Sequence, residues 1–116
     1  MRKTDSRIQV RSKIWLEIEG EPVFGQGREE LLHRIQKTGS INAAAKEMGI
    51  PYRKAWTYID AMEKRMGFPL VTRQKGGAGG GKSTLSPRAI TLLGKFRDLK
   101  KDFDDMVNRR FVELDF

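Results

Sequence analysis

Three glycines, Gly39, Gly49 and Gly67, constrain the fold of this chain most, because each follows a short stretch with helical periodicity. Glycine is common just past the last turn of a helix, where it adopts the left-handed backbone conformation without strain. These positions predict three short helices in succession, separated by tight turns. The expected helices span residues 28–38, 41–48 and 51–66.

Local signals support the starts and the inner faces of these helices. Ser40 is a good N-cap for the second helix, and Pro51 suits the first turn of the third. On the third helix, apolar side chains spaced by four, three and four residues predict the face that packs against the core. That face consists of Ala55, Ile59, Met62 and Met66.

The segment after the third helix changes to extended character. Residues 68–74 predict a strand, five of the twelve glycines lie between 76 and 81, and residues 83–85 predict a returning strand. Ser86 followed by Pro87 is typical of a helix start. We expect a long helix from this point to about residue 111.

The N-terminal region has a different period. From Ile8 to Ile18 the even positions are apolar, apart from Ser12, which predicts a long amphipathic strand. Glycines then predict a turn-rich stretch with a short return strand around Val23 and Phe24.

The order of these elements predicts the fold class. Two helices joined by a short turn and followed by a glycine-rich strand-loop-strand are typical of a winged helix-turn-helix. We therefore predict a mostly helical α+β domain. Residues 1–86 would form the winged helix-turn-helix with its N-terminal strand, and residues 87–116 a long dimerisation helix of the same single domain.

Composition excludes several classes of protein. A chain of 116 residues is one domain, and no apolar run approaches the eighteen or so residues that a membrane span needs. There is no cysteine and only one histidine, His33, so we expect no metal site, no cofactor and no enzymatic activity. We expect a soluble, cytoplasmic protein without a secretory signal.

The net charge of +8 is concentrated in the middle of the chain. Residues 51–88 hold eight basic and two acidic side chains and so carry +6 of the total. A clustered basic excess indicates a polyanionic partner, and beside a helix-turn-helix pattern we expect that partner to be double-stranded DNA, with RNA as the alternative.

Two tracts carry a resemblance to a known family. SINAAAKEMGIPYRKAW at residues 40–56 and GGAGGGKSTLS at residues 76–86 resemble the helix-turn-helix and the glycine-rich wing of the ModE-type molybdate-responsive repressors, a branch of the LysR-like winged helices. The resemblance covers roughly residues 7–105. Members of the family carry two further molybdate-binding modules after the long helix, so we expect DNA binding and dimerisation here without molybdate binding. A sensor on a separate polypeptide is then a conceivable partner.

The resemblance implies which residues contact DNA. Such domains insert the start of the third helix into the major groove, where Arg53 and Lys54 can reach guanine or phosphate, Thr57 a base edge and Tyr52 a sugar or a thymine methyl. The turn before the second helix and the wing would bind the sugar-phosphate backbone. The expected contact residues are Ser40, Asn42, Pro51, Tyr52, Arg53, Lys54, Trp56, Thr57, Arg73, Lys75, Gly77, Gly79, Lys82 and Ser83.

Apolar side chains on the last helix repeat at four and three residues and resemble a coiled-coil seam. A helix of some 25 residues overhangs a compact winged helix and exposes part of this seam unless a partner covers it. We therefore expect a homodimer on an inverted repeat, although the seam can also serve the core of one chain. The expected interface residues are Phe96, Leu99, Phe103 and Met106.

Each of these patterns has an alternative interpretation. GGAGGGKS at residues 76–83 satisfies the P-loop pattern of nucleotide-binding proteins, but the next helix begins several residues too late to meet a phosphate. The same glycines can form a flexible linker, Trp56 and Tyr52 can be packing residues, and Arg53 with Lys54 can belong to a solvated face. At the level of function, the alternatives are a protein-interaction or effector-sensing adaptor and a non-specific DNA-binding protein.

Overall fold

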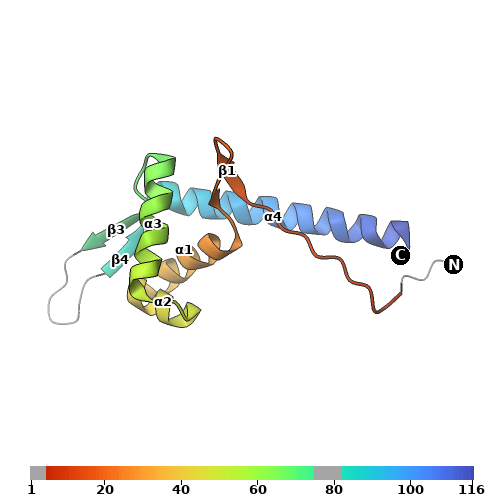
Figure 1. Ribbon diagram of the computed structural model, residues 1–116, viewed down its shortest axis with the longest axis horizontal. Helices are drawn as coiled ribbons and strands as arrows, with labels where there is room; N and C mark the ends of the chain where they lie inside the picture. Colours follow the sequence, from red (N-terminus) through yellow and green to blue (C-terminus); the bar gives the residue numbers. More distant parts are fainter. Residues whose placement is uncertain (1–4, 75–81) are drawn as a thin grey trace.

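A computed structural model describes residues 5–74 and 82–116 as four helices and two short hairpins. In chain order the elements are β1 (Leu16–Ile18), β2 (Glu21–Phe24), α1 (Gln26–Thr38), α2 (Ile41–Met48), α3 (Tyr52–Met66), β3 (Val71–Gln74), β4 (Lys82–Leu85) and α4 (Pro87–Leu114). The molecule extends 65 Å along its longest axis because α4 projects well beyond the other helices (Figure 1). This confirms the predicted mostly helical α+β winged helix with a long last helix.

The helix boundaries follow the capping residues. Gly39 and Gly49 end α1 and α2 with φ angles of 71° and 68°, which a residue with a Cβ adopts only with strain. The hydroxyls of Ser40 and Ser86 accept hydrogen bonds from the backbone N–H groups of Ala43 (3.0 Å) and Ala89 (3.1 Å). The predicted caps of α2 and α4 are therefore confirmed.

Three predicted boundaries were wrong by a few residues. α1 begins at Gln26, two residues before the predicted start, and α4 continues to Leu114. Pro51 does not lie in the first turn of α3 but precedes it as the N-cap, with an extended backbone (φ −63°, ψ 146°). Its ring fixes φ near this value in either position, so the sequence signal alone does not separate the two.

The core lies where α1, α2, α3 and the first half of α4 meet. Ala55, Ile59 and Met62 of α3 are buried as predicted, whereas Met66 is only partly buried at the edge of the core. Burial of large aliphatic and aromatic side chains supplies the main driving force for this packing. The largest fully buried side chains are Phe24, Leu31, Leu32, Ile35, Ile59, Met62 and Leu70.

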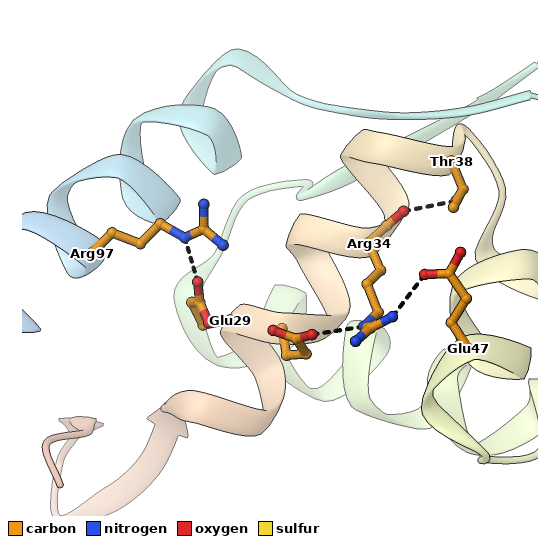
Figure 2. Close-up of polar contacts among 6 residues, drawn as sticks. Glu29, Arg34, Thr38, Glu47 and Arg97 are labelled. Carbon is orange, nitrogen blue, oxygen red and sulfur yellow. Dashed lines mark hydrogen bonds and ion pairs between the residues drawn. The ribbon is translucent and has the colours of Figure 1, made fainter.

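Ion pairs join α1 to the helices on either side of it. Figure 2 shows Arg97 of α4 donating to Glu29 of α1, and Arg34 of α1 donating to Glu47 of α2. Arg34 also donates to Glu30, and its hydrogen bonds to the two carboxylates raise the pKa of Arg34, the bond to Glu47 contributing most. These ion pairs supplement the apolar packing of α1 against α2 and α4.

The N-terminal segment differs from the predicted long strand. Only Leu16–Ile18 form a strand, paired with β2, and no strand in the described part of the chain pairs with residues 8–15. This segment instead runs beside α4 (Figure 1), where the Ser12 hydroxyl donates to the Asp104 carboxylate. An extended segment with alternating side chains presents one apolar face, and that face can pack against a helix as well as against a strand. The predicted alternation along residues 8–15 was therefore correct, but the prediction that these residues form a β-strand was wrong.

Asp104 also ties this segment to the charged face of α4. Lys100 donates to its second oxygen at 2.9 Å, and the hydrogen bonds from Lys100 and Ser12, in that order of size, lower the pKa of Asp104. The carboxylate is therefore ionised at neutral pH and holds the N-terminal segment to the outer half of α4.

Candidate nucleic-acid interface

The first turn of α3 carries the strongest concentration of predicted contact residues. Tyr52, Arg53 and Lys54 are all exposed, while the next residue, Ala55, is fully buried. The turn between α2 and α3 is closed by a hydrogen bond from the Ile50 N–H to the Ala45 carbonyl (3.0 Å). The tight turn therefore fixes the start of α3 against α2 and leaves two cationic side chains free to face a ligand.

Further along α3 the predicted contact residues have internal partners. The Thr57 hydroxyl donates to the Arg53 carbonyl at 3.0 Å, although the side chain remains exposed and can still accept a hydrogen bond. Trp56 is half-buried, packs against the core and meets the ring of Tyr52 edge to face, with centroids 6.4 Å apart. Trp56 thus has a packing role that Arg53 and Lys54 lack.

β3 and β4 form the antiparallel hairpin expected of a wing. Val71 pairs with Leu85 and Gln74 with Lys82, so the two strands remain in register along their whole length. β3 begins at Val71 and not at residue 68 as predicted, and β4 begins one residue earlier than predicted. The expected contacts Lys75, Gly77 and Gly79 lie outside the described residues.

The wing is fixed to the helices at its base. The backbone N–H of Ser83 donates to the Gly39 carbonyl (2.9 Å), and the Ser86 hydroxyl donates to the Pro69 carbonyl (2.7 Å). We predicted that Ser83 contacts DNA. Its side chain is only 5% exposed, however, and is therefore not available to a ligand. Alternation along β4 turns Ser83 inward and leaves its neighbour Lys82 exposed.

The turn before α2 presents one of its two predicted contacts. Asn42 is exposed, whereas the hydroxyl of Ser40 is half-buried and occupied by the N–H of Ala43. Ser40 therefore orders the start of α2, and Asn42 is the side chain there that remains free to approach a phosphate.

Sequence reasoning missed Glu63, which connects α3 to the wing. One carboxylate oxygen accepts hydrogen bonds from the backbone N–H groups of Leu70 (2.7 Å) and Val71 (3.2 Å). The carboxylate thereby satisfies two backbone amides and sets the start of β3 relative to α3. In the sequence, Glu63 looks like any other acidic residue on the polar face of a helix, so no local signal predicts that it accepts hydrogen bonds from the wing.

The long helix separates the predicted interface residues into two groups. Phe96 is 2% exposed and belongs to the core, so its predicted place at a dimer interface was wrong. Leu99 and Met106 are 52% and 46% exposed, and Phe103 is half-buried. The apolar seam therefore serves the core in its first half and lies at the surface in its second.

The described residues do not have the geometry of a nucleotide-hydrolysing or metal site. Lys82 and Ser83 of the P-loop-like tract lie in β4, and the next helix begins only at Pro87. Within residues 5–74 and 82–116, no three His, Asp or Glu side chains gather where they could hold a metal ion. None of the helices in the same ranges has both the length and the apolarity to cross a membrane.

A short helix, a tight turn, a second helix with exposed cations on its first turn and a β-hairpin fixed to that pair together define a winged helix-turn-helix, a DNA-binding class of domain. The family model for bacterial regulatory helix-turn-helix proteins of the LysR family matches residues 29–89, more than half of the chain. The chain belongs to this family, whose members are transcription regulators and not a class of enzymes.

Curated relatives confirm the resemblance to the ModE group. The chain is 44% identical over 66 residues to the transcriptional regulator ModE of Haemophilus influenzae, covering 57% of this chain and 26% of that protein. It is 42% identical over 86 residues to the DNA-binding transcriptional dual regulator ModE of Escherichia coli K12, covering 74% and 33%. The molybdenum-pterin-binding protein MopB of Rhodobacter capsulatus is 40% identical over 73 residues, covering 63% and 27%. The matches span about a quarter to a third of each of these relatives.

Proposed function

We propose that this chain is a sequence-specific DNA-binding regulator that acts as a homodimer on an inverted repeat. In this mechanism α3 enters the major groove, the wing contacts the neighbouring sugar-phosphate backbone, and α4 joins the two copies. The two recognition helices of a symmetric dimer then reach half-sites separated by one helical turn or a multiple of it.

The observation that carries this proposal is the first turn of α3. Arg53 and Lys54 are exposed there, and no ion pair within the described residues engages either side chain. An arginine on a helix that enters the major groove can donate two hydrogen bonds to O6 and N7 of guanine, which distinguishes one base pair from the others. Arg53 is the side chain we assign to base readout, with Lys54, Tyr52 and Thr57 beside it.

The exposed half of α4 supports the dimer. Leu99 and Met106 are seven residues apart and therefore lie on one side of the helix, each about half exposed. Exposed large apolar side chains repeated at this spacing are typical of a helix that packs against a second helix. A second copy supplies such a helix with the same seam, and two-fold symmetry matches an inverted repeat in the DNA.

We assign affinity, as distinct from sequence preference, to phosphate contacts. Asn42 at the start of α2 and Lys82 on the wing are exposed in positions suited to the DNA backbone. Each neutralised phosphate releases counterions, so the logarithm of the binding constant should fall steeply with the logarithm of the salt concentration.

Selection of bound duplexes from fragmented genomic DNA at about 150 mM salt tests the proposal, because non-specific phosphate contacts are already weakened there. The expected result is an enriched inverted repeat, bound by two copies of the chain. Binding that disappears at this salt concentration without enrichment would indicate a non-specific DNA-binding protein. Absence of binding to any duplex, even at low salt, would favour the alternative of a protein-interaction or effector-sensing adaptor.

A further inference from the structure

Arg73 and Trp56 form a contact that joins the wing to the recognition helix. The guanidinium carbon of Arg73, on β3, lies 4.0 Å from the centre of the Trp56 indole, on α3. At this distance the positive charge faces the electron-rich ring and the planar group stacks on it. This pair adds a contact between the wing and the recognition helix to the one that Glu63 makes with the start of β3.

The surroundings of Trp56 are those of a supporting residue. The indole is half-buried against the core, it meets the ring of Tyr52 edge to face, and Arg73 lies over its face. These three contacts occupy much of the surface that a base would need. Trp56 was predicted as a base contact from its position on α3. Its packing instead favours a role in supporting the neighbouring side chains.

Arg73, in contrast, remains available for a ligand. It is exposed, and no carboxylate within the described residues pairs with it. An unrestrained arginine on a strand loses considerable rotamer freedom when it binds, and a stack that already holds the guanidinium reduces that loss. The ring leaves the N–H groups at the edge of the guanidinium free to donate to a phosphate.

We infer that Trp56 is a positioning residue that holds the Arg73 guanidinium for a DNA phosphate and does not itself contact a base. This rests on the proposed function, because it assigns roles within the same DNA-binding surface. It implies that the wing and the recognition helix bind DNA as one unit. Trp56 would then contribute to the affinity for DNA only by positioning Arg73.

A double-mutant cycle on the full chain tests the inference. Trp56→Leu, Arg73→Ala and the double variant are compared with the wild type for binding to the selected duplex, at several salt concentrations. Trp56→Leu should weaken binding about two- to fivefold, which corresponds to a cation–π contact at an exposed site. In the Arg73→Ala background the same change should have almost no effect. Arg73→Ala should also lower the salt slope by about one, because one phosphate contact is lost.

Two controls separate positioning from a general effect on the fold. Trp56→Phe keeps an aromatic face for the guanidinium and should recover most of the affinity. Urea unfolding of the same four proteins should show that Trp56→Leu still destabilises the domain in the Arg73→Ala background, because its packing against the core is lost, whereas its effect on DNA binding disappears there. In the free protein, NMR should show ring-current shifts on the Arg73 side chain that Trp56→Leu removes.

Equal losses of affinity from Trp56→Leu in both backgrounds would overturn the inference, because Trp56 would then contact DNA itself or act through the fold. An unchanged salt slope in Arg73→Ala, or Arg73 resonances that do not respond to Trp56→Leu, would overturn it as well. Failure of the proposed function appears differently, as a wild-type chain that shows no salt-dependent binding to any duplex.

Discussion

The ring of Phe24 on β2 meets the ring of Phe96 on α4 edge to face, with centroids 5.0 Å apart and planes at 90°. Both side chains are almost completely buried, at 1% and 2% exposure. This pair joins the N-terminal hairpin to the long helix inside one copy of the chain. It also marks the point on α4 where the core ends, because the next residue of the seam, Leu99, is exposed.

Phe96→Ala should therefore destabilise each copy of the chain and not simply separate two copies. Removing a buried phenylalanine leaves a cavity and costs about 3–5 kcal/mol in unfolding free energy. Urea unfolding measures this loss, and Leu99→Ala is the matched control on the same helix, expected to stay within about 0.5 kcal/mol per folded monomer. Equal losses from the two changes, at a protein concentration where the chain is monomeric, would contradict the division of the seam.

Met106→Glu should weaken self-association while leaving the core intact. The side chain is exposed in one copy, so a carboxylate there is solvated in the monomer and buried only in the expected dimer. Sedimentation equilibrium should show a monomer at concentrations where the wild type is a dimer, and affinity for a duplex with two half-sites should fall at least about tenfold. Lys101→Ala, on the same helix but in an exposed pair with Asp105, should change neither result. A wild type that is monomeric at high concentration would contradict the expected dimer.

Lys82→Ala should weaken binding to all DNA sequences alike. The side chain is exposed at the first residue of β4, opposite Gln74, and in the proposed function it contacts a phosphate. The slope of log K against log salt should become shallower by about one, with sequence preference unchanged. Lys101→Ala again serves as the control for loss of a positive charge away from the wing. A changed sequence preference in Lys82→Ala would show that the wing reads bases.

Glu63→Ala should loosen the wing from α3. The change removes the acceptor of two backbone N–H groups, those of Leu70 and Val71, and an unsatisfied amide costs about 1–3 kcal/mol. Hydrogen exchange at these two amides should accelerate, and unfolding free energy should fall by a similar amount. Glu21→Ala, at an exposed position on β2, is the control expected to have no such effect. Unchanged exchange at Leu70 and Val71 would show that water replaces the carboxylate without cost.

Much of the fold could be predicted because its signals are local. Gly39 and Gly49 end helices through their own backbone conformation, and Ser40 and Ser86 begin helices through hydrogen bonds three residues away. Such signals depend on few neighbours, so a single sequence reveals them.

The features that were missed depend on contacts between distant residues. Residues 8–15 have the alternation of a strand, but only the tertiary arrangement shows that α4 is their neighbour. The four- and three-residue spacing of apolar side chains on α4 likewise does not show which half of the helix packs against the core. Phe96 was therefore predicted at a dimer interface, although it is buried in the core of one copy. Ser83 was expected among the DNA contacts from the family resemblance, while its burial appears only in the folded chain. The contact between Trp56 and Arg73 likewise joins residues far apart in the sequence.

The claim that α3 reads the DNA sequence is tested most directly by selecting duplexes with wild type and with Arg53→Ala in parallel. The wild type should enrich an inverted repeat, and Arg53→Ala should lose the preference for one base pair, symmetrically in each half-site. Its affinity for the wild-type site should fall by about 1–3 kcal/mol. Retention of the full sequence preference by Arg53→Ala would contradict the account, because the base contacts would then come from another part of the chain.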